Sequence, residues 1–223
     1  MAKQVKSQKK ITPAGIVSMY MDSVLENEKY PKSVYKFAKE NKISEEQFYS
    51  FYGSLEALQK DIWVQFYNNA AELIKGSAEL QEASNRDKLL TFFYTLFEIL
   101  TANRSYVLYV LNVLNENDQE LKNLKQLKDL RKHILNFASD LVEDENDEQN
   151  IKFLQRNKKI YAEGTWLQFL FLLKFWKEDD SASFEKTDVA IEKSVNTIFD
   201  ILDNSALERV FDLGKFLYKE ILK

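Results

Sequence analysis

The sequence predicts an all-α protein, and three observations support this prediction. Its 223 residues include only five glycines and two prolines, and both prolines precede residue 32. Alternating strands would need more turn residues than these. Apolar residues recur at helical spacing along most of the chain. Because 45% of the residues are hydrophobic, there is enough material for a sizeable core in one or two domains.

The N-terminal part predicts three short helices followed by a long one. The first spans about residues 11–28, because Thr12 is a natural N-cap and Pro13 suits the first helical position. A second helix is expected over residues 32–41, and a third begins at Ser44. The tight turn between the second and third helices is typical of a helix-turn-helix motif.

Local signals define the third and fourth helices. The pattern Ser44-x-x-Gln47 predicts a capping box at the start of the third helix. The fourth helix is expected over residues 54–75, with Gly76 as its stop. The residues expected to be buried in these two helices are Phe48, Phe51 or Tyr52, Leu58, Ile62, Phe66, Ala70 and Leu73.

The larger C-terminal part predicts a helical bundle. Its expected helices span residues 85–101, 104–116, 118–142, 149–177, 184–203 and 205–222. The acidic cluster from Asp140 to Glu148 is interpreted as a solvated loop between two of them. Its spacing lacks the central glycine and terminal bidentate Glu of a calcium-binding EF-hand. His133, on a lysine-rich helix, is expected at the surface.

Composition argues against catalysis and against metal binding. The chain has no cysteine and a single histidine, which excludes thiolate zinc fingers, cysteine enzymes, His-based metal sites and Ser-His-Asp triads. It contains no GxGxxG or GxxxxGK[ST] phosphate-binding loop. We therefore expect no enzymatic activity, no metal and no cofactor.

The hydropathy pattern predicts a soluble protein. The longest apolar run, from Trp166 to Trp176, is interrupted by Gln168 and Lys174. It is too short for a membrane span, which needs about 20 apolar residues. The first ten residues contain lysines with no apolar stretch after them, unlike a secretory signal. We expect a cytoplasmic location and no membrane partner.

Charge is distributed unevenly along the chain. Residues 1–60 contain ten lysines and seven acidic residues, whereas residues 61–223 contain 21 basic and 28 acidic residues. Four of the lysines lie within the first ten residues. A basic arm on a small positive domain is typical of nucleic-acid binding, and a solubilising tail is the alternative interpretation.

The stretch SVYKFAKENKISEEQFYSFYGSLEAL, residues 33–58, resembles the DNA-binding signature of TetR-family repressors. The resemblance implies a helix-turn-helix domain over residues 1–56 and a ligand-binding and dimerisation domain over residues 57–223. It further implies a homodimer that binds palindromic double-stranded DNA and is released by a small hydrophobic ligand. The matching positions are Ser33, Val34, Phe37, Ala38, Ile43, Ser44, Phe48, Tyr49, Phe51, Tyr52, Ser54, Glu56 and Leu58.

The resemblance also implies which residues contact DNA, because the family places its third helix in the major groove. Gln47 could pair with adenine, and Tyr49 could donate to a phosphate. Lys36 and its neighbours on the second helix could supply contacts to the DNA backbone. The residues implied as DNA contacts are Lys9, Lys10, Ser33, Lys36, Ser44, Glu45, Gln47, Tyr49 and Ser50.

Several positions depart from the family pattern. Glu45 and Glu46 stand where the family usually has a basic or small residue, and Leu55 replaces a phosphate-contacting lysine. Lys42 replaces the glycine of the turn. Acidic residues in a first turn also interact favourably with the helix dipole, which needs no DNA. The departures favour an alternative function, a TetR-fold protein that no longer binds DNA and binds or presents a lipid or quinone.

The family's C-terminal part encloses an inducer pocket and forms the dimer. Asn103, Arg104 and Gln168 are the polar anchors expected for a ligand. The aromatic residues expected to line such a pocket, or else to form ordinary core, are Phe92, Phe93, Phe97, Tyr161, Trp166 and Phe169.

The helix expected over residues 149–177 carries apolar side chains all round, so it must be covered on every side. Trp166, Phe169, Leu170 and Leu173 can face the core of their own subunit. The side chains then left to be covered by something else are Leu167, Phe171 and Phe175. In TetR-like proteins, two late helices of each subunit pack into a four-helix dimer interface. A wholly intrachain core is the alternative.

Overall fold

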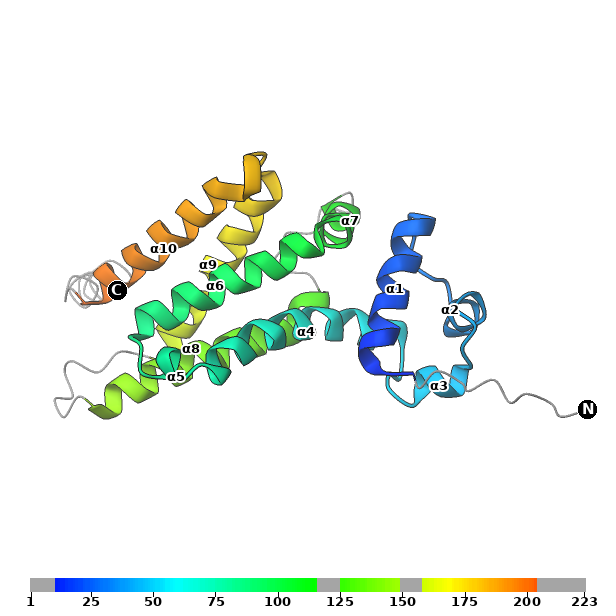
Figure 1. Cartoon of the computed structure of the whole chain (residues 1–223), viewed down its shortest axis with the longest axis horizontal. Coiled ribbons are helices and arrows are strands. Elements are labelled where there is room, and N and C mark those ends of the chain that lie inside the picture. Colours follow the sequence, from blue (N-terminus) through cyan, green and yellow to red (C-terminus); the bar gives the residue numbers. More distant parts are fainter. Residues whose placement is uncertain (1–10, 116–124, 149–157, 204–223) are drawn as a thin grey trace, which may run out of the picture. The chain divides into compact units, whose positions relative to one another are not determined.

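The computed structural model describes residues 11–115, 125–148 and 158–203, and all regular elements among them are helical (Figure 1). This confirms the predicted all-α fold class. The expected helix over residues 205–222 lies outside the described residues. The α-helices are α1 (Pro13–Asn27), α2 (Val34–Glu40), α3 (Glu45–Tyr49), α4 (Leu55–Gly76), α5 (Ala78–Gln81), α6 (Asn85–Ala102), α7 (Arg104–Asn115), α8 (Lys128–Glu148), α9 (Lys158–Glu178) and α10 (Glu185–Asp203). Two short 3₁₀ helices, η2 (Lys125–Leu127) and η4 (Ala182–Phe184), precede α8 and α10.

The helices form two compact units. The N-terminal unit comprises Met1–Gln65 together with Asn103–Asp129, and the C-terminal unit comprises Phe66–Ala102 together with Leu130–Lys223. By packing, the first half of α4 and all of α7 therefore belong with α1 to α3. The functional boundary predicted after residue 56 falls inside the first turn of α4.

Buried aromatic rings form the core of the N-terminal unit. Tyr20 of α1 meets Phe37 of α2 edge to face with ring centroids 5.8 Å apart, and Phe37 meets Phe48 of α3 in the same way at 5.8 Å. All three side chains are fully buried. The Gln59 side chain on α4 donates a 2.6 Å hydrogen bond to the Tyr20 hydroxyl. A continuous set of contacts thus links the first four helices.

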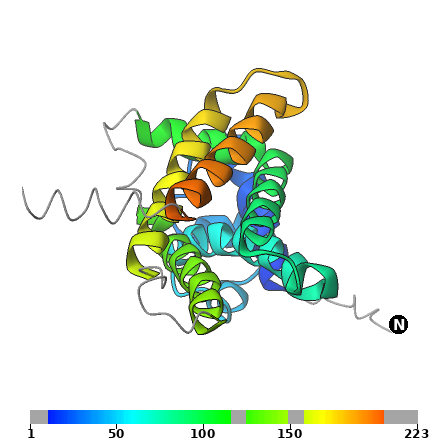
Figure 2. The same cartoon turned by 90° about the vertical axis from the view of Figure 1, so that its left-hand side faces the viewer.

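The C-terminal unit is built around α6, which packs with α9 and α10. Helix α10 lies against both α6 and α9 (Figure 2). The indole N–H of Trp176 on α9 donates to the Thr101 hydroxyl on α6 at 2.9 Å. Arg86 of α6 forms a 2.8 Å ion pair with Asp200 of α10 and lies over the Phe199 ring. These polar contacts therefore hold α9 and α10 against α6 around an apolar interior.

The structure corrects the expected burial on α4. Leu58, Ile62, Phe66 and Ala70 are buried as predicted, but Leu73 is 59% exposed and Ile74 is buried in its place. The buried positions continue in steps of four residues, so the stripe reaches Ile74 rather than Leu73.

Two further expectations differ from the structure, and one short helix was not expected. The backbone of α8 is helical through Glu148, so the acidic cluster is not a loop. His133 is half-buried, with its ring centroid 5.1 Å from that of Tyr67, rather than at the surface. The short helix α5 was not predicted. It begins where the Ser77 hydroxyl accepts a hydrogen bond from the Leu80 N–H.

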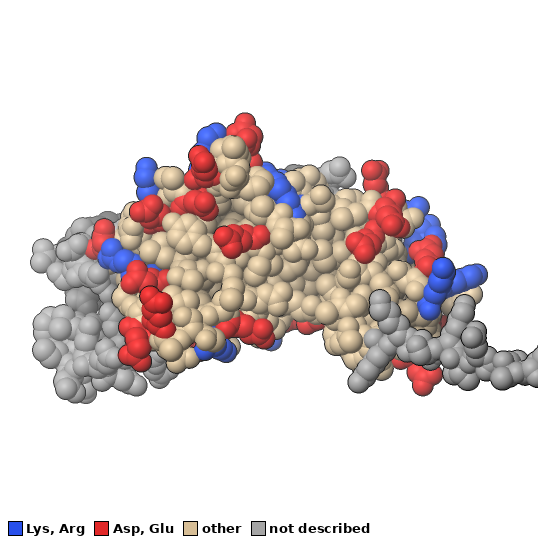
Figure 3. Space-filling view, viewed as in Figure 1, with Lys and Arg blue, Asp and Glu red and all other residues tan. Residues whose placement is uncertain are grey.

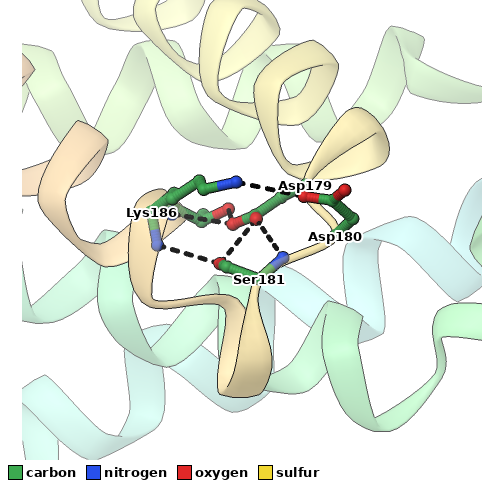
Figure 4. A network of polar contacts seen from close by, with 5 residues as sticks. Asp179, Asp180, Ser181 and Lys186 are labelled. Atoms are coloured by element: carbon green, nitrogen blue, oxygen red, sulfur yellow. Dashed lines mark hydrogen bonds and ion pairs between the residues drawn. The ribbon is translucent and has the colours of Figure 1, made fainter.

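A buried carboxylate closes the connection between α9 and α10 (Figure 4). Asp179 accepts hydrogen bonds from the N–H and hydroxyl of Ser181 at 2.9 and 2.6 Å, and from the N–H and hydroxyl of Thr187 at 2.9 and 2.6 Å. Burial raises the pKa of Asp179, but these four donors outweigh it and lower the pKa from 3.8 to about 2. Since Thr187 lies in the first turn of α10, Asp179 caps that helix from across the connection.

We expect Asp179→Asn to lower the free energy of unfolding at pH 7 by about 1–2 kcal/mol, because it removes a charge that four donors stabilise. Since the native pKa lies below the ordinary value, the stabilisation is complete above pH 3.8 and is lost as the pH falls through about 2. Urea unfolding between pH 7 and pH 2 would measure it. Asp180→Asn, at the adjacent exposed carboxylate, is the control and should change little. An equal effect of both substitutions would contradict the assignment.

Candidate functional site

Helices α2 and α3 form a helix-turn-helix whose turn is closed by hydrogen bonds to main-chain carbonyls. The Ile43 N–H donates to the Ala38 carbonyl at 3.0 Å, and the Asn41 side chain donates to the Phe37 carbonyl at 2.9 Å. Lys42 adopts the left-handed conformation with φ 56°. This is the position at which the family usually has glycine, so the sequence places a strained side chain there.

The predicted capping box at the start of α3 is confirmed. The Ser44 hydroxyl accepts from the Gln47 N–H at 3.1 Å, and the Gln47 side-chain oxygen accepts from the Ser44 N–H at 2.8 Å. Reading adenine would require the same Gln47 oxygen to accept from the base while its amide nitrogen donates. Gln47 could therefore read a base only by sharing its oxygen with the helix cap.

Most of the residues expected to contact DNA are exposed on α2 and α3. Gln47 is half-buried, and Lys9 and Lys10 lie outside the described residues. The hydroxyls of Ser33 and Ser44 accept capping hydrogen bonds, so each retains its own proton for a phosphate. The Ser50 hydroxyl instead donates to the Gln47 carbonyl. The exposed members of the set are Ser33, Lys36, Ser44, Glu45, Tyr49 and Ser50.

The charges on this surface are mixed in sign. Lys36 forms a 3.7 Å ion pair with Glu40, and the Lys39 ammonium lies 5.8 Å from the centre of the Tyr35 ring. Within the described part of the chain, Glu45 and Glu46 make no ion pair. Figure 3 shows basic and acidic side chains interspersed on the visible face of α1 to α3. The first turn of α3 therefore keeps its negative charge.

The aromatic cluster after α3 fixes that helix against α4. Tyr52 is buried, whereas Phe51 is exposed, which settles the alternative left open by the sequence. The Tyr52 hydroxyl donates to Asp61 on α4 at 2.7 Å, and the Gln65 side chain donates to the same carboxylate oxygen at 2.7 Å. Burial raises the pKa of Tyr52, and its hydrogen bond to Asp61 raises it further. Tyr52 is thus a structural residue that holds α3 in place.

A second candidate site is an apolar groove of about 1020 Å³ between α9 and α10. Leu167 is 62% exposed and Phe171 is 53% exposed, so the described residues leave this part of α9 uncovered, as predicted. Polar and charged residues also line the groove, mainly from α10. The apolar lining residues are Leu167, Phe171, Phe175, Val189, Ala190 and Ile198, and the polar or charged ones include Gln168, Glu185, Lys186, Lys193, Ser194 and Thr197.

A model of the family described as "Tetracyclin repressor-like, C-terminal domain" matches residues 88–217, more than half of the chain. The chain belongs to the TetR family. The match lies in the C-terminal part, whereas the resemblance seen in the sequence lies in residues 33–58, so the two observations are independent. None of the curated proteins compared with the chain matches it.

The TetR family is a family of regulators and not a family of enzymes. Among the described residues, no three or more histidine or acidic side chains are grouped to hold a metal ion. The described helices include none that is both long and apolar enough to cross a membrane.

The structure places the aromatic residues expected around a TetR inducer in the interior of the C-terminal unit. Phe97 lies 6.2 Å from Phe169, which stacks on Trp166 at 5.4 Å. Phe92 and Phe93 pack together on α6, and Tyr161 meets Phe199. All six residues of the expected set are buried, and none of them lines the α9–α10 groove. Their role as ligand contacts stays a prediction.

Sequence reasoning missed most of the groove residues on α10. Of the three expected polar anchors, only Gln168 lines the groove, where its amide nitrogen donates to the Ser194 hydroxyl at 2.9 Å. Its side-chain oxygen is buried and accepts no hydrogen bond within the described residues. Val189 is 46% exposed, although the buried stripe of α10 runs through Ile191 and Val195. In the sequence, the available signal for the groove was Val189, an apolar residue outside the buried stripe of α10.

We expect Lys42→Gly to raise the free energy of unfolding by about 0.5–1 kcal/mol, because glycine adopts the left-handed conformation without the steric cost that lysine has there. Chemical denaturation measures this effect. The matched control is Lys39→Gly inside α2, which should lower stability by about 1 kcal/mol. A loss of stability in both variants would show that the turn does not strain Lys42.

Proposed function

We propose that this TetR-family protein is a transcriptional regulator, acting as a repressor, that binds operator DNA as a homodimer and is released by a small hydrophobic ligand. The observation that carries the proposal is the α2–α3 geometry. A capped five-residue helix follows a tight turn, is anchored from behind by Phe48, and presents an exposed outer face. The match to the family supports a regulator of this type.

In the proposed complex α3 lies in the major groove and α2 lies against the DNA backbone. The Ser33 and Ser44 hydroxyls and the Lys36 ammonium contact phosphates. Tyr49, which is 52% exposed, donates to a phosphate, and Glu45 accepts from a cytosine amino group. Because the first turn of α3 is negative, the N-terminal arm with Lys9 and Lys10 supplies much of the non-specific attraction.

The dimer is proposed to form through α9 and α10. Leu167 and Phe171 are large apolar side chains on one face of α9, and they border a groove whose other wall is α10. Exposed apolar surface of this kind marks an interaction site. A two-fold symmetric pair would present two α3 helices to the two half-sites of a palindromic operator.

The proposed ligand site is the aromatic interior of the C-terminal unit. Phe92, Phe93, Phe97, Tyr161, Trp166 and Phe169 would contact a flat or apolar ligand there. Because these rings pack against one another, a ligand can enter only if the helices that carry them move apart. The ligand would then favour a dimer conformation whose α3 spacing no longer fits the operator.

A second function is favoured by two features, one at the start of α3 and one at the start of α4. Glu45 and Glu46 have no counter-charge within the described residues, and Leu55 stands where the family usually has a phosphate-contacting lysine. These features lower the affinity for a polyanion. They suit a TetR-fold protein that no longer binds DNA and binds or presents a lipid or quinone.

For DNA binding, we expect a duplex from the gene's own upstream region to bind with an affinity that falls steeply with salt. Lys36→Ala should reduce the slope of log affinity against log salt by about 1. The double variant Glu45→Gln, Glu46→Gln should strengthen binding several-fold at low salt, because it removes two negative charges. Fluorescence anisotropy across a salt titration measures both effects.

Glu72→Gln on α4 is a control that should leave DNA binding unchanged. The proposal fails if no duplex binds even at low salt, or if binding is indifferent to sequence. Native mass spectrometry of the purified protein then distinguishes the second function, since a co-purifying lipid or quinone without DNA affinity would support it.

For the dimer, we expect Leu167→Asp or Phe171→Asp to convert the protein to a monomer, because each would place a charge inside an apolar interface. Sedimentation equilibrium measures the change in mass. The matched control is Leu73→Asp, since Leu73 is 59% exposed on α4 and does not line the groove. Dimers of equal stability in all three variants would place the interface elsewhere.

A further inference from the structure

Helix α10 carries a charged and apolar stripe along its exposed side. Glu185, Val189 and Lys193 are spaced four residues apart, so they lie on one face of the helix, and all three are exposed. All three line the α9–α10 groove. The stripe has a negative charge at one end, an apolar centre and a positive charge at the other.

The two charged ends of the stripe take no part in the ion pairs of the described residues. Neither Glu185 nor Lys193 forms an ion pair in the part of the chain that the structure describes. Their neighbour Lys186, in contrast, pairs with Asp180 at 3.1 Å, and Arg131 of α8 pairs with Glu163 of α9 at 2.7 Å. The stripe has opposite charges on either side of an apolar centre. Two copies of it are therefore complementary when they meet in antiparallel orientation.

We propose that α10 meets α10 of a second copy in antiparallel orientation, with the two-fold axis beside Val189. Residues equally far before and after Val189 then face each other. Glu185 therefore pairs with Lys193 of the partner subunit, Lys193 with Glu185 of the partner subunit, and the two Val189 side chains meet at the axis. This inference rests on the proposed dimer and assigns its register.

The charges select this orientation over the parallel one. In a parallel pair, Glu185 would meet Glu185 and Lys193 would meet Lys193, and both contacts would be repulsive. The α9 side of the groove cannot make that selection. Leu167, Phe171 and Phe175 are also four residues apart, but all are apolar, so they attract a partner in either orientation. The apolar residues thus supply affinity, and the α10 charges specify the arrangement.

The test is a charge exchange in the full-length protein. Glu185→Lys and Lys193→Glu each place two like-charge contacts in the dimer, so each should raise the dimer dissociation constant about tenfold or more. The double variant, with both substitutions, should return to within about threefold of the wild type, because it restores both pairs with reversed polarity. Sedimentation equilibrium at low salt measures all four proteins.

The matched controls are Glu72→Lys and Lys75→Glu, which reverse the same charges on exposed positions of α4 that do not line the groove. They should leave the dissociation constant unchanged. Raising the salt concentration should narrow the differences among the Glu185 and Lys193 variants, since exposed charges are screened.

Three results would overturn the inference. If both single variants weaken the dimer and the double variant does not recover, the two residues do not face each other. If neither single variant has an effect while Leu167→Asp gives a monomer, the proposed dimer stands and the register is wrong. If the wild type is monomeric at every concentration, the proposed dimer fails as well.

Discussion

The edge-to-face contacts from Tyr20 through Phe37 to Phe48 are the interaction on which the N-terminal unit depends. Helix α3 has only five residues, far fewer than a helix needs to be stable alone in water. Its orientation is therefore set by Phe48, which is fully buried and packs against Phe37 of α2, and by its capping box. Each proposed DNA contact on α3 depends on this aromatic core, together with the capping box and the hydrogen bond from Tyr52 to Asp61.

In the C-terminal unit, a small set of polar contacts determines which face of α10 is left uncovered. Asp179 caps the helix at its start, and Arg86 of α6 holds its far end through Asp200. These contacts direct Ile191 and Val195 into the core. Helical geometry then requires that Val189, two residues before Ile191, faces away from the core. The apolar groove and the charged stripe thus follow from how the ends of one helix are fixed.

Local signals predicted more of the structure than periodicity did. Thr12 caps α1 and Ser44 with Gln47 caps α3 as predicted, because capping depends on residues three apart in the chain. No such local signal predicts the burial of Ile74 in place of Leu73, because both residues are apolar and tertiary packing decides which of them is buried. The acidic run through Glu148 is helical despite its like charges. Predicting the groove would have required knowing that α9 and α10 lie side by side, which a single sequence does not show.

The acidic first turn of α3 has a structural explanation that leaves the proposed function intact. A five-residue helix gains little from its own hydrogen bonds, and Glu45 and Glu46 each stabilise its N-terminus by about 0.3–1 kcal/mol through the helix dipole. Lys42, in its strained left-handed conformation, removes part of that gain. The same two carboxylates would repel phosphates, so the stability of α3 and the proposed affinity for DNA oppose each other here. A regulator built in this way would bind non-specific DNA weakly and would depend on base contacts for its operator.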